Sequence, residues 1–208
     1  SLDVQLHDMH LRAQLDHIDA HFEADLHGSL DSVCAQNMQL IFRGEQLFSG
    51  SIAIVQPTQL DSLYIQADST DLFCNGALLQ TLLEQLSVQS FSLPPIITQL
   101  GDVHYHGNIH GWLDSLSLKG AFNNSLGSID VEGYIHSDTT FQNFYFSGNV
   151  HTQSFQLGRL LKQADLGSVT LDAQVNGLFE DGQFVEATTT AKIQQFEYKN
   201  YSYQNIHI

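Results

Sequence analysis

Positive charge, cysteine and long apolar runs are scarce or absent in this sequence, and each absence excludes a class of partner or structure. Only 7 Lys and Arg stand against 23 Asp and Glu in 208 residues, a formal net charge of -16. Such an acidic surface repels phosphate backbones and has no general attraction to anionic membranes, so we expect no nucleic-acid partner. No apolar run reaches about 18 residues, so the sequence predicts no transmembrane helix.

Motifs that mark enzymes are also missing. The chain has no Gly-rich phosphate loop, no Gly-x-Ser-x-Gly elbow and no His-Glu-x-x-His pair. Its carboxylates are spread over polar positions rather than paired, so they form no acid–base dyad. We therefore expect no enzyme activity, no catalytic residue and no cofactor.

The two cysteines and three prolines carry little structural information. Cys34 and Cys74 make neither a disulfide scaffold nor a Cys-x-x-Cys zinc site. Two separate thiols and one long-range disulfide, adding roughly 4 kcal/mol, both fit the sequence. Pro94-Pro95 marks a break between strands. Because strand patterns without a signal peptide stand at both ends, we expect a segment of a longer protein.

What the sequence does have is alternation of apolar and polar residues, the pattern of strands with one buried and one wet face. In 103–111 the apolar positions fall on one face, and three histidines fall on the other. The same period recurs along the chain, and Gly/Asn/Asp/Ser clusters at short spacings separate the runs, which predicts antiparallel hairpins. The apolar rows of the later strands begin at Leu116, Ile129, Phe144, Val169 and Val185.

Two segments have helical periodicity instead. In 75–86 five leucines fall on one helical stripe, with Asn75 as the N-cap, and 157–162 is a shorter candidate helix. We interpret both stripes as packing surfaces. The longer helix is expected to pack on the apolar face of the sheet.

The histidines His104, His106 and His110 raise the question of a metal site, because His-x-His is a zinc spacing. Residues two apart on a strand are about 6.6 Å apart and residues four apart about 13 Å, so a third ligand must come from another strand. A tight hairpin at 111–114 places Asn123, Ala121 and Ser117 opposite them, and none of these is a usual zinc ligand. We therefore expect no metal site, and we expect these side chains to point away from the apolar face.

The apolar rows also contain repeated glycines. The same hairpin places Gly107 opposite Gly120, and tight turns further on would place Gly148 opposite Val131. Glycine weakens a strand and marks either a bend or a close approach by another group. Two interpretations remain: the glycines permit curling of the sheet, or they line a ligand channel.

From about Leu93 onward the chain resembles the TamB branch of the AsmA-like, bridge-like lipid transfer proteins of Gram-negative bacteria. The resemblance covers a little over half of the chain, and it depends on the order of several short cues. These cues are Pro94-Pro95 with Leu100-Gly101, Ser125-Leu126-Gly127, Phe155-Gln156-Leu157-Gly158 before Leu160-Leu161, Leu166-Gly167, and Tyr201-x-Tyr203-x-Asn205-Ile206.

The resemblance implies an all-β fold: a curled antiparallel sheet, taco-like or an open-barrel groove, with one or two short helices. It divides the chain into 1–90, an N-terminal β-rich segment with a helix near 75–86, and 91–208, TamB-like β-groove repeats continuous with it. It also implies a periplasmic location, with the parent protein anchored in the inner membrane, and a TamA-like outer-membrane barrel protein as a partner.

The expected function is therefore carriage of phospholipid between the inner and outer membranes, with acyl chains in an apolar groove. The alternative is an interaction scaffold for outer-membrane protein assembly, whose sheet edges pair with other chains. We expect these residues to line the groove: Tyr105, Ile109, Leu118, Phe122, Ile129, Val131, Phe144, Phe146, Val169 and Leu171.

Overall fold

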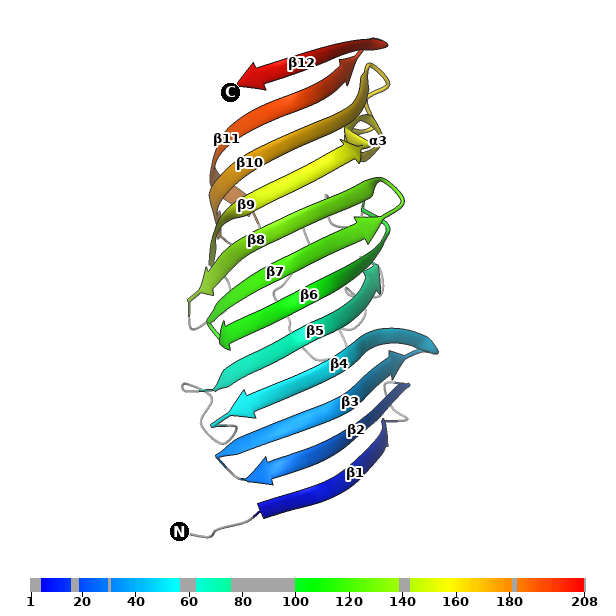
Figure 1. The fold of residues 1–208 in the computed structure, drawn as a ribbon, viewed down its shortest axis with the longest axis vertical. Helices are drawn as coiled ribbons and strands as arrows, with labels where there is room; N and C mark the ends of the chain where they lie inside the picture. The colour runs from blue at the N-terminus through cyan, green and yellow to red at the C-terminus, as the bar shows by residue number, and fades with distance from the viewer. Residues whose placement is uncertain are drawn as a thin grey trace.

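In the computed structural model, residues 5–15, 19–29, 31–56, 63–75, 100–138, 143–180 and 183–207 are described. They form one 12-stranded antiparallel sheet, in which the strands lie side by side in chain order (Figure 1). Within these ranges one short helix, α3 (Leu157–Leu161), accompanies the sheet. The strands are β1 (Gln5–Leu15), β2 (Ala20–Ser29), β3 (Ser32–Phe42), β4 (Glu45–Val55), β5 (Tyr64–Asn75), β6 (Asp102–Trp112), β7 (Ser115–Asn124), β8 (Gly127–Ser137), β9 (Phe144–Phe155), β10 (Leu166–Glu180), β11 (Gln183–Tyr198) and β12 (Tyr201–His207).

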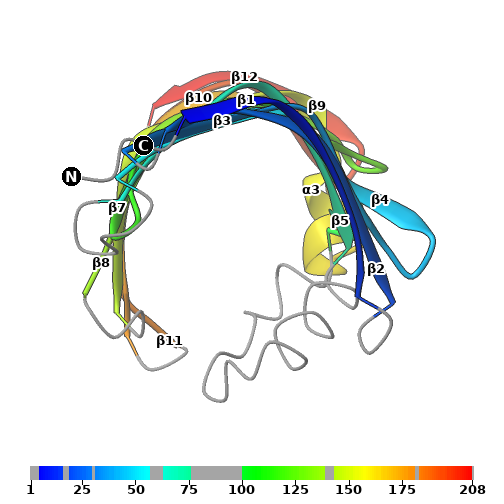
Figure 2. The ribbon, with the colours of Figure 1, turned by 90° about the horizontal axis from the view of Figure 1, so that it is seen from below.

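The sheet is curled along the direction of its strands. Seen along its long axis it forms an arch with a convex outer face and a concave inner face, and α3 lies inside the arch (Figure 2). The sheet does not close, since β1 and β12 lie at its opposite ends. The expected all-β, curled antiparallel fold is therefore confirmed. The sheet also continues across the expected boundary near residue 90, because β5 pairs with β6.

Regular alternation of apolar and polar residues accounts for the four central strands, β6 to β9. β6, β7, β8 and β9 pair without any register shift. Most alternate positions of each strand are apolar or glycine, so one face can be buried without breaking the ladder of hydrogen bonds. The hairpin predicted for β6 and β7 has the expected register, with Gly107 opposite Gly120 and His104 opposite Asn123.

β-Bulges bend the N-terminal strands. The pairing shifts between Glu23 and Asp25, between Ala35 and Met38, between Ser49 and Ser51, and between Ala67 and Thr70, at neighbouring places on β2 to β5. Within these bulges Asn37 and Ser69 both have a φ of 49°. An extra residue in one strand bends it and increases its local twist, so this line of bulges contributes to the curl of the sheet.

Two small clusters of buried residues pack on the sheet. Ala20, Phe42 and Leu47 form one, with Leu40 against it. Leu126, Phe155 and Val169 form the other, and Leu157 and Leu160 of α3 pack on it. The helix predicted at 157–162 is thus confirmed, and its leucines serve packing.

Two other expectations concern the helix predicted at 75–86 and the pairing of the two cysteines. The helix predicted at 75–86 lies outside the described residues, except that Asn75 is the last residue of β5. Cys34 is a free, half-buried thiol. It faces Ala53, which in turn faces Gln66 of β5. Cys74 is eight residues further along β5, about 25 Å away, so the sheet keeps the two cysteines too far apart for a disulfide.

Candidate functional site

The helix α3 identifies which side chains point to the inner face. Leu157 and Leu160 of α3 share a cluster with Ile129, Leu171 and Phe196 of the sheet. Because α3 lies inside the arch, these sheet residues point inward (Figure 2). Side chains alternate along each strand and directly paired residues share a face, so the pairing register assigns the remaining positions.

One apolar row crosses the inner face on every strand from β2 to β12. Its members are directly opposite one another in each strand pair, so they run along the long axis of the sheet. Ten strand spacings give the row a length of about 48 Å. We call this set the inner apolar row: Phe22, Leu40, Phe48, Leu72, Tyr105, Phe122, Ile129, Thr152, Leu171, Ile193 and Ile206.

The single polar member of this row is satisfied internally. Thr152 is buried, and its hydroxyl donates a hydrogen bond to the carbonyl oxygen of Val169 at 3.2 Å. A buried hydroxyl with a partner adds little polarity to its surroundings. The row therefore remains an apolar strip at this point.

A second inner row, beside the first, has small side chains over β8 to β11. Val131 faces Val150, Val150 faces Ala173, and Ala173 faces Ala191. The large side chains of the inner apolar row therefore lie higher than the small side chains of the second row. The inner surface is uneven, and this step in height follows the long axis of the sheet.

All ten predicted groove residues lie on the inner face by this register. Tyr105 and Val169 are buried, whereas the other eight are half-buried. Tyr105 and Phe122 pack together with ring centroids 4.8 Å apart, and Phe144 packs on Phe179 at 6.4 Å. The residues thus form a continuous surface over β6 to β10 rather than one compact pocket.

Sequence reasoning found the apolar face of β2, including Phe22, but missed the inner residues of β4 and β5. Phe48 and Leu72 continue the inner apolar row beyond Tyr105. The alternation of Phe48, Ile52 and Ile54 is a signal that could have identified this face. The bulges in these strands interrupt a strict period of two and weaken that signal.

Aromatic rings cover several of the inner glycines. A Cβ atom on Gly107 would lie 2.6 Å from the Tyr105 hydroxyl, and one on Gly177 would clash with Cζ of the Phe146 ring and lie 2.7 Å from its Cε1. The Tyr105 hydroxyl donates to the carbonyl oxygen of Asn108 at 2.9 Å, and burial raises the pKa of Tyr105. At these positions the glycines make room for a flat ring, so neither of the two earlier interpretations describes them fully.

The predicted position of Gly148 was wrong. Gly148 lies opposite Gly133, and Val131 lies opposite Val150. The connection between β8 and β9 is longer than a tight turn, with the Asp138 amide donating to the carbonyl oxygen of Asn143 at 3.1 Å. The resulting shift is two residues, an even number, so every side chain keeps its face.

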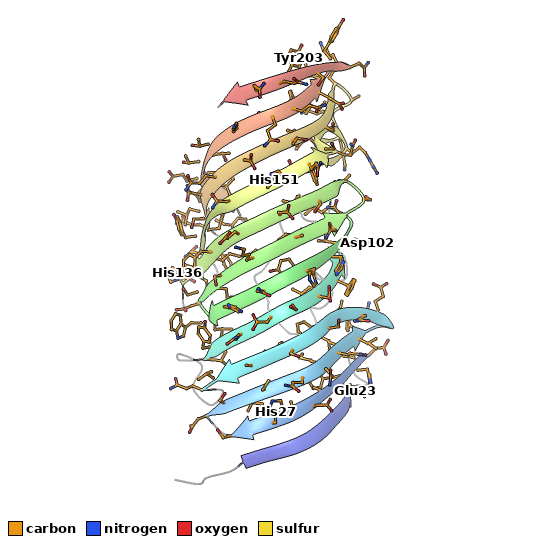
Figure 3. The ribbon with its side chains drawn as sticks, viewed as in Figure 1. Glu23, His27, Asp102, His136, His151 and Tyr203 are labelled. Carbon is orange, nitrogen blue, oxygen red and sulfur yellow. The ribbon has the colours of Figure 1, made fainter. Side chains whose placement is uncertain are left out.

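The outer face carries the histidines, as expected. Figure 3 looks onto this face, where His151 lies on β9. His104 and His106 both donate to one oxygen of Asp71, at 2.7 and 2.9 Å, and His110 donates to Asp68 at 2.7 Å. Sequence reasoning missed both aspartates, because they come from β5, which precedes the long connection to β6.

We expect the stability contributed by Asp71 to disappear in acid. Hydrogen bonds from His104, and then from His106, lower the pKa of Asp71 below its ordinary 3.8. The folded state therefore binds this proton less tightly than the unfolded state, so the contribution is present above about pH 4 and lost as the pH falls further. Asp71 lies at the surface with 30% of its side chain exposed, and solvent screening should keep the effect below about 1 kcal/mol.

Thermal melting of Asp71→Asn and of the unchanged protein between pH 6 and pH 3 checks this expectation. The difference in Tm between the two should shrink toward pH 3. Asp130→Asn, an exposed carboxylate on the same face, is the matched control. Parallel pH profiles for the unchanged protein and Asp71→Asn would contradict it.

Within the described ranges, no three His, Cys, Asp or Glu side chains are grouped so that they could hold a metal ion. In the same ranges no helix has the length and apolar character needed to cross a membrane. No family model, curated protein or solved structure matches this chain.

Proposed function

We propose that this chain is part of a periplasmic β-rod whose inner face carries phospholipid between the inner and outer membranes and so supports outer-membrane biogenesis. The observation that carries this proposal is the inner apolar row. It runs the length of an open, curled sheet, and most of its residues stay only half-buried.

An apolar path of this kind shields the acyl chains of a phospholipid from water. Each acyl CH₂ exposed to water costs about 0.8 kcal/mol, so two acyl chains with about 28 of them do not cross an aqueous gap unaided. A continuous apolar surface removes most of that cost at every position along the path. On the side of the arch that the described strands leave uncovered, the head group would stay in water.

The two inner rows suggest where an acyl chain would lie. The inner apolar row offers large side chains such as Phe122 and Ile129, and the neighbouring row offers small ones such as Val131 and Ala173. A chain lying on the small row would contact the large row from the side. Many similar contacts and no polar anchor favour movement along the surface over tight binding at one place.

The second candidate is a scaffold for outer-membrane protein assembly with a TamA-like partner. The open ends of the sheet favour it, because β12 pairs only with β11 in the described part of the chain. Tyr201 and Tyr203 of β12 are exposed. An edge strand of this kind can accept another strand by backbone hydrogen bonding.

Photo-crosslinking separates the two candidates. Benzoylphenylalanine would replace Phe122 on the inner face or Tyr134 on the outer face, and the protein would be purified without detergent. We expect phospholipid, identified by mass spectrometry, to be attached at position 122 and to be nearly absent at position 134. Equal labelling at both positions, or no lipid at 122, would contradict carriage on the inner face. The same label in place of the exposed Tyr203 of β12 tests the scaffold, which crosslinks to an outer-membrane barrel without lipid at 122 would favour.

A further inference from the structure

The outer face has a trough of its own, lined mostly by polar residues. Two open hollows of about 750 and 600 Å³ lie on it. They share Lys119, Glu132, Asn149 and Gln174, so they form one continuous surface over β6 to β11. His151, labelled on β9 in Figure 3, lines the first hollow.

A row of polar side chains in direct register forms the centre of this trough. Each member lies opposite the next across one strand pair, and all of them line the hollows. Five strand spacings give it a length of about 24 Å, room for about four sugar rings. We call this set the outer polar row: Asn108, Lys119, Glu132, Asn149, Gln174 and Thr190.

The charge of the trough is nearly balanced, unlike that of the chain. Two of the seven cationic residues, Lys119 and Lys192, line it together with three carboxylates, Asp130, Glu132 and Asp172. Counting these groups gives a net charge of -1 (2 − 3), whereas the whole chain carries -16. Lys119 and Glu132 also pair with each other at 3.1 Å. A neutral ligand rich in hydrogen-bonding groups suits this surface better than an anion or a polycation.

Two exposed aromatic rings stand in the second hollow. Tyr134 and Tyr145 both line it, with 40% and 45% of their surfaces exposed. The Tyr134 ring is held in place by the Ser115 hydroxyl and lies parallel to the ring of His136, at an interplanar angle of 6°. Exposed tyrosines provide a flat apolar face and a polar tip at low entropic cost, which suits the C–H face of a sugar ring.

We propose that this trough binds a neutral, extended oligosaccharide along the outer polar row. Amide and carboxylate side chains spaced at each strand would donate to and accept from neighbouring sugar hydroxyls, while the tyrosines contact one ring face. A straight row favours a β-1,4-linked chain, which is extended, over an α-1,4-linked chain, which coils. The lipid proposal concerns the opposite face of the sheet, so either proposal can fail without the other.

Titration of the isotope-labelled protein with cellotetraose, tetra-N-acetylchitotetraose or mannotetraose, all β-1,4-linked, tests this site by NMR. We expect at least one to bind with a Kd below about 1 mM and to shift amide signals of β7 to β10. Maltotetraose, the α-1,4-linked control, should bind at least 10-fold more weakly. Asn149→Ala and Tyr145→Ala should each weaken binding, and together by 10-fold or more.

Tyr201→Ala is the matched control variant, since it removes an exposed tyrosine outside the trough. It should leave the affinity unchanged, and thermal melting of every variant verifies folding. Absence of binding by all three β-1,4-linked probes would overturn the proposal. So would equal binding of maltotetraose, or binding that is insensitive to both Asn149→Ala and Tyr145→Ala in folded protein.

Discussion

Replacing Val131 with Asp should block lipid delivery to the outer membrane while leaving the abundance of the full-length protein nearly normal. Val131 is half-buried in the row of small side chains on the inner face. A carboxylate there can still reach water when no lipid is present, so folding should tolerate it. An acyl chain passing over it would enclose an unpaired charge in apolar surroundings, which is costly. Phe146→Asp is a less clean test, because the Phe146 ring also covers Gly177.

Cellular abundance and the delivery of labelled phospholipid to the outer membrane would be measured together. Ser147→Asp is the matched control, because it adds the same charge to the outer face of the neighbouring strand β9. It should leave delivery unchanged. Loss of the Val131→Asp protein would indicate that the position is ordinary core. Normal abundance with normal delivery would reject an acyl path over Val131.

Adding a single methyl group at Gly120 should destabilise the fold by about 3 kcal/mol, near the upper end of the usual cost of overpacking. A Cβ atom on Gly120 would lie 2.7 Å from the Cα of Gly107 and 2.9 Å from the ring of Tyr105. The first contact is backbone and cannot move without separating β6 from β7. The second is a buried ring whose hydroxyl is already bonded to Asn108.

Urea denaturation of Gly120→Ala measures this cost. Gly133→Ala is the matched control, because Gly133 is on the same face of the adjacent strand β8. Its nearest contacts would be 3.0 Å and 3.6 Å, so small adjustments suffice, and it should lose about 1 kcal/mol or less. A loss below about 1 kcal/mol for Gly120→Ala would mean that Tyr105 does not pack on the glycine pair as described.

The central part of the fold could be predicted from the sequence because its alternation is strict. Within 103–111, 116–122 and 127–135 every second residue is apolar or glycine, and tight turns fix the register of β6, β7 and β8. That register is enough to place Tyr105, Phe122 and Ile129 on one face. It is also enough to place the histidines on the other.

The pairing of strands that are separated by a long connection could not be predicted from the sequence. The partners of His104, His106 and His110 lie on β5, and a period of two does not say which strand comes next across a long connection. The sequence also does not reveal the bulges near Asn37 and Ser69. Both residues have a positive φ in the structure, but in the sequence they look like any other polar residue of a strand. The inner apolar row is therefore visible as one feature only from the ten strand pairings between β2 and β12 together.

The strictly sequential order of the strands has a consequence for how this protein loses its structure. Each strand packs on the strands before and after it, and α3 packs on β10. The contacts that stabilise the sheet therefore connect mainly elements that are neighbours in the chain. Assemblies of this kind approximate a one-dimensional chain of coupled units, in which unfolding can begin at an end and stop at a strong junction. The well-matched pairs from β6 to β9 would then act as such a junction, holding the middle of the sheet while its ends fray.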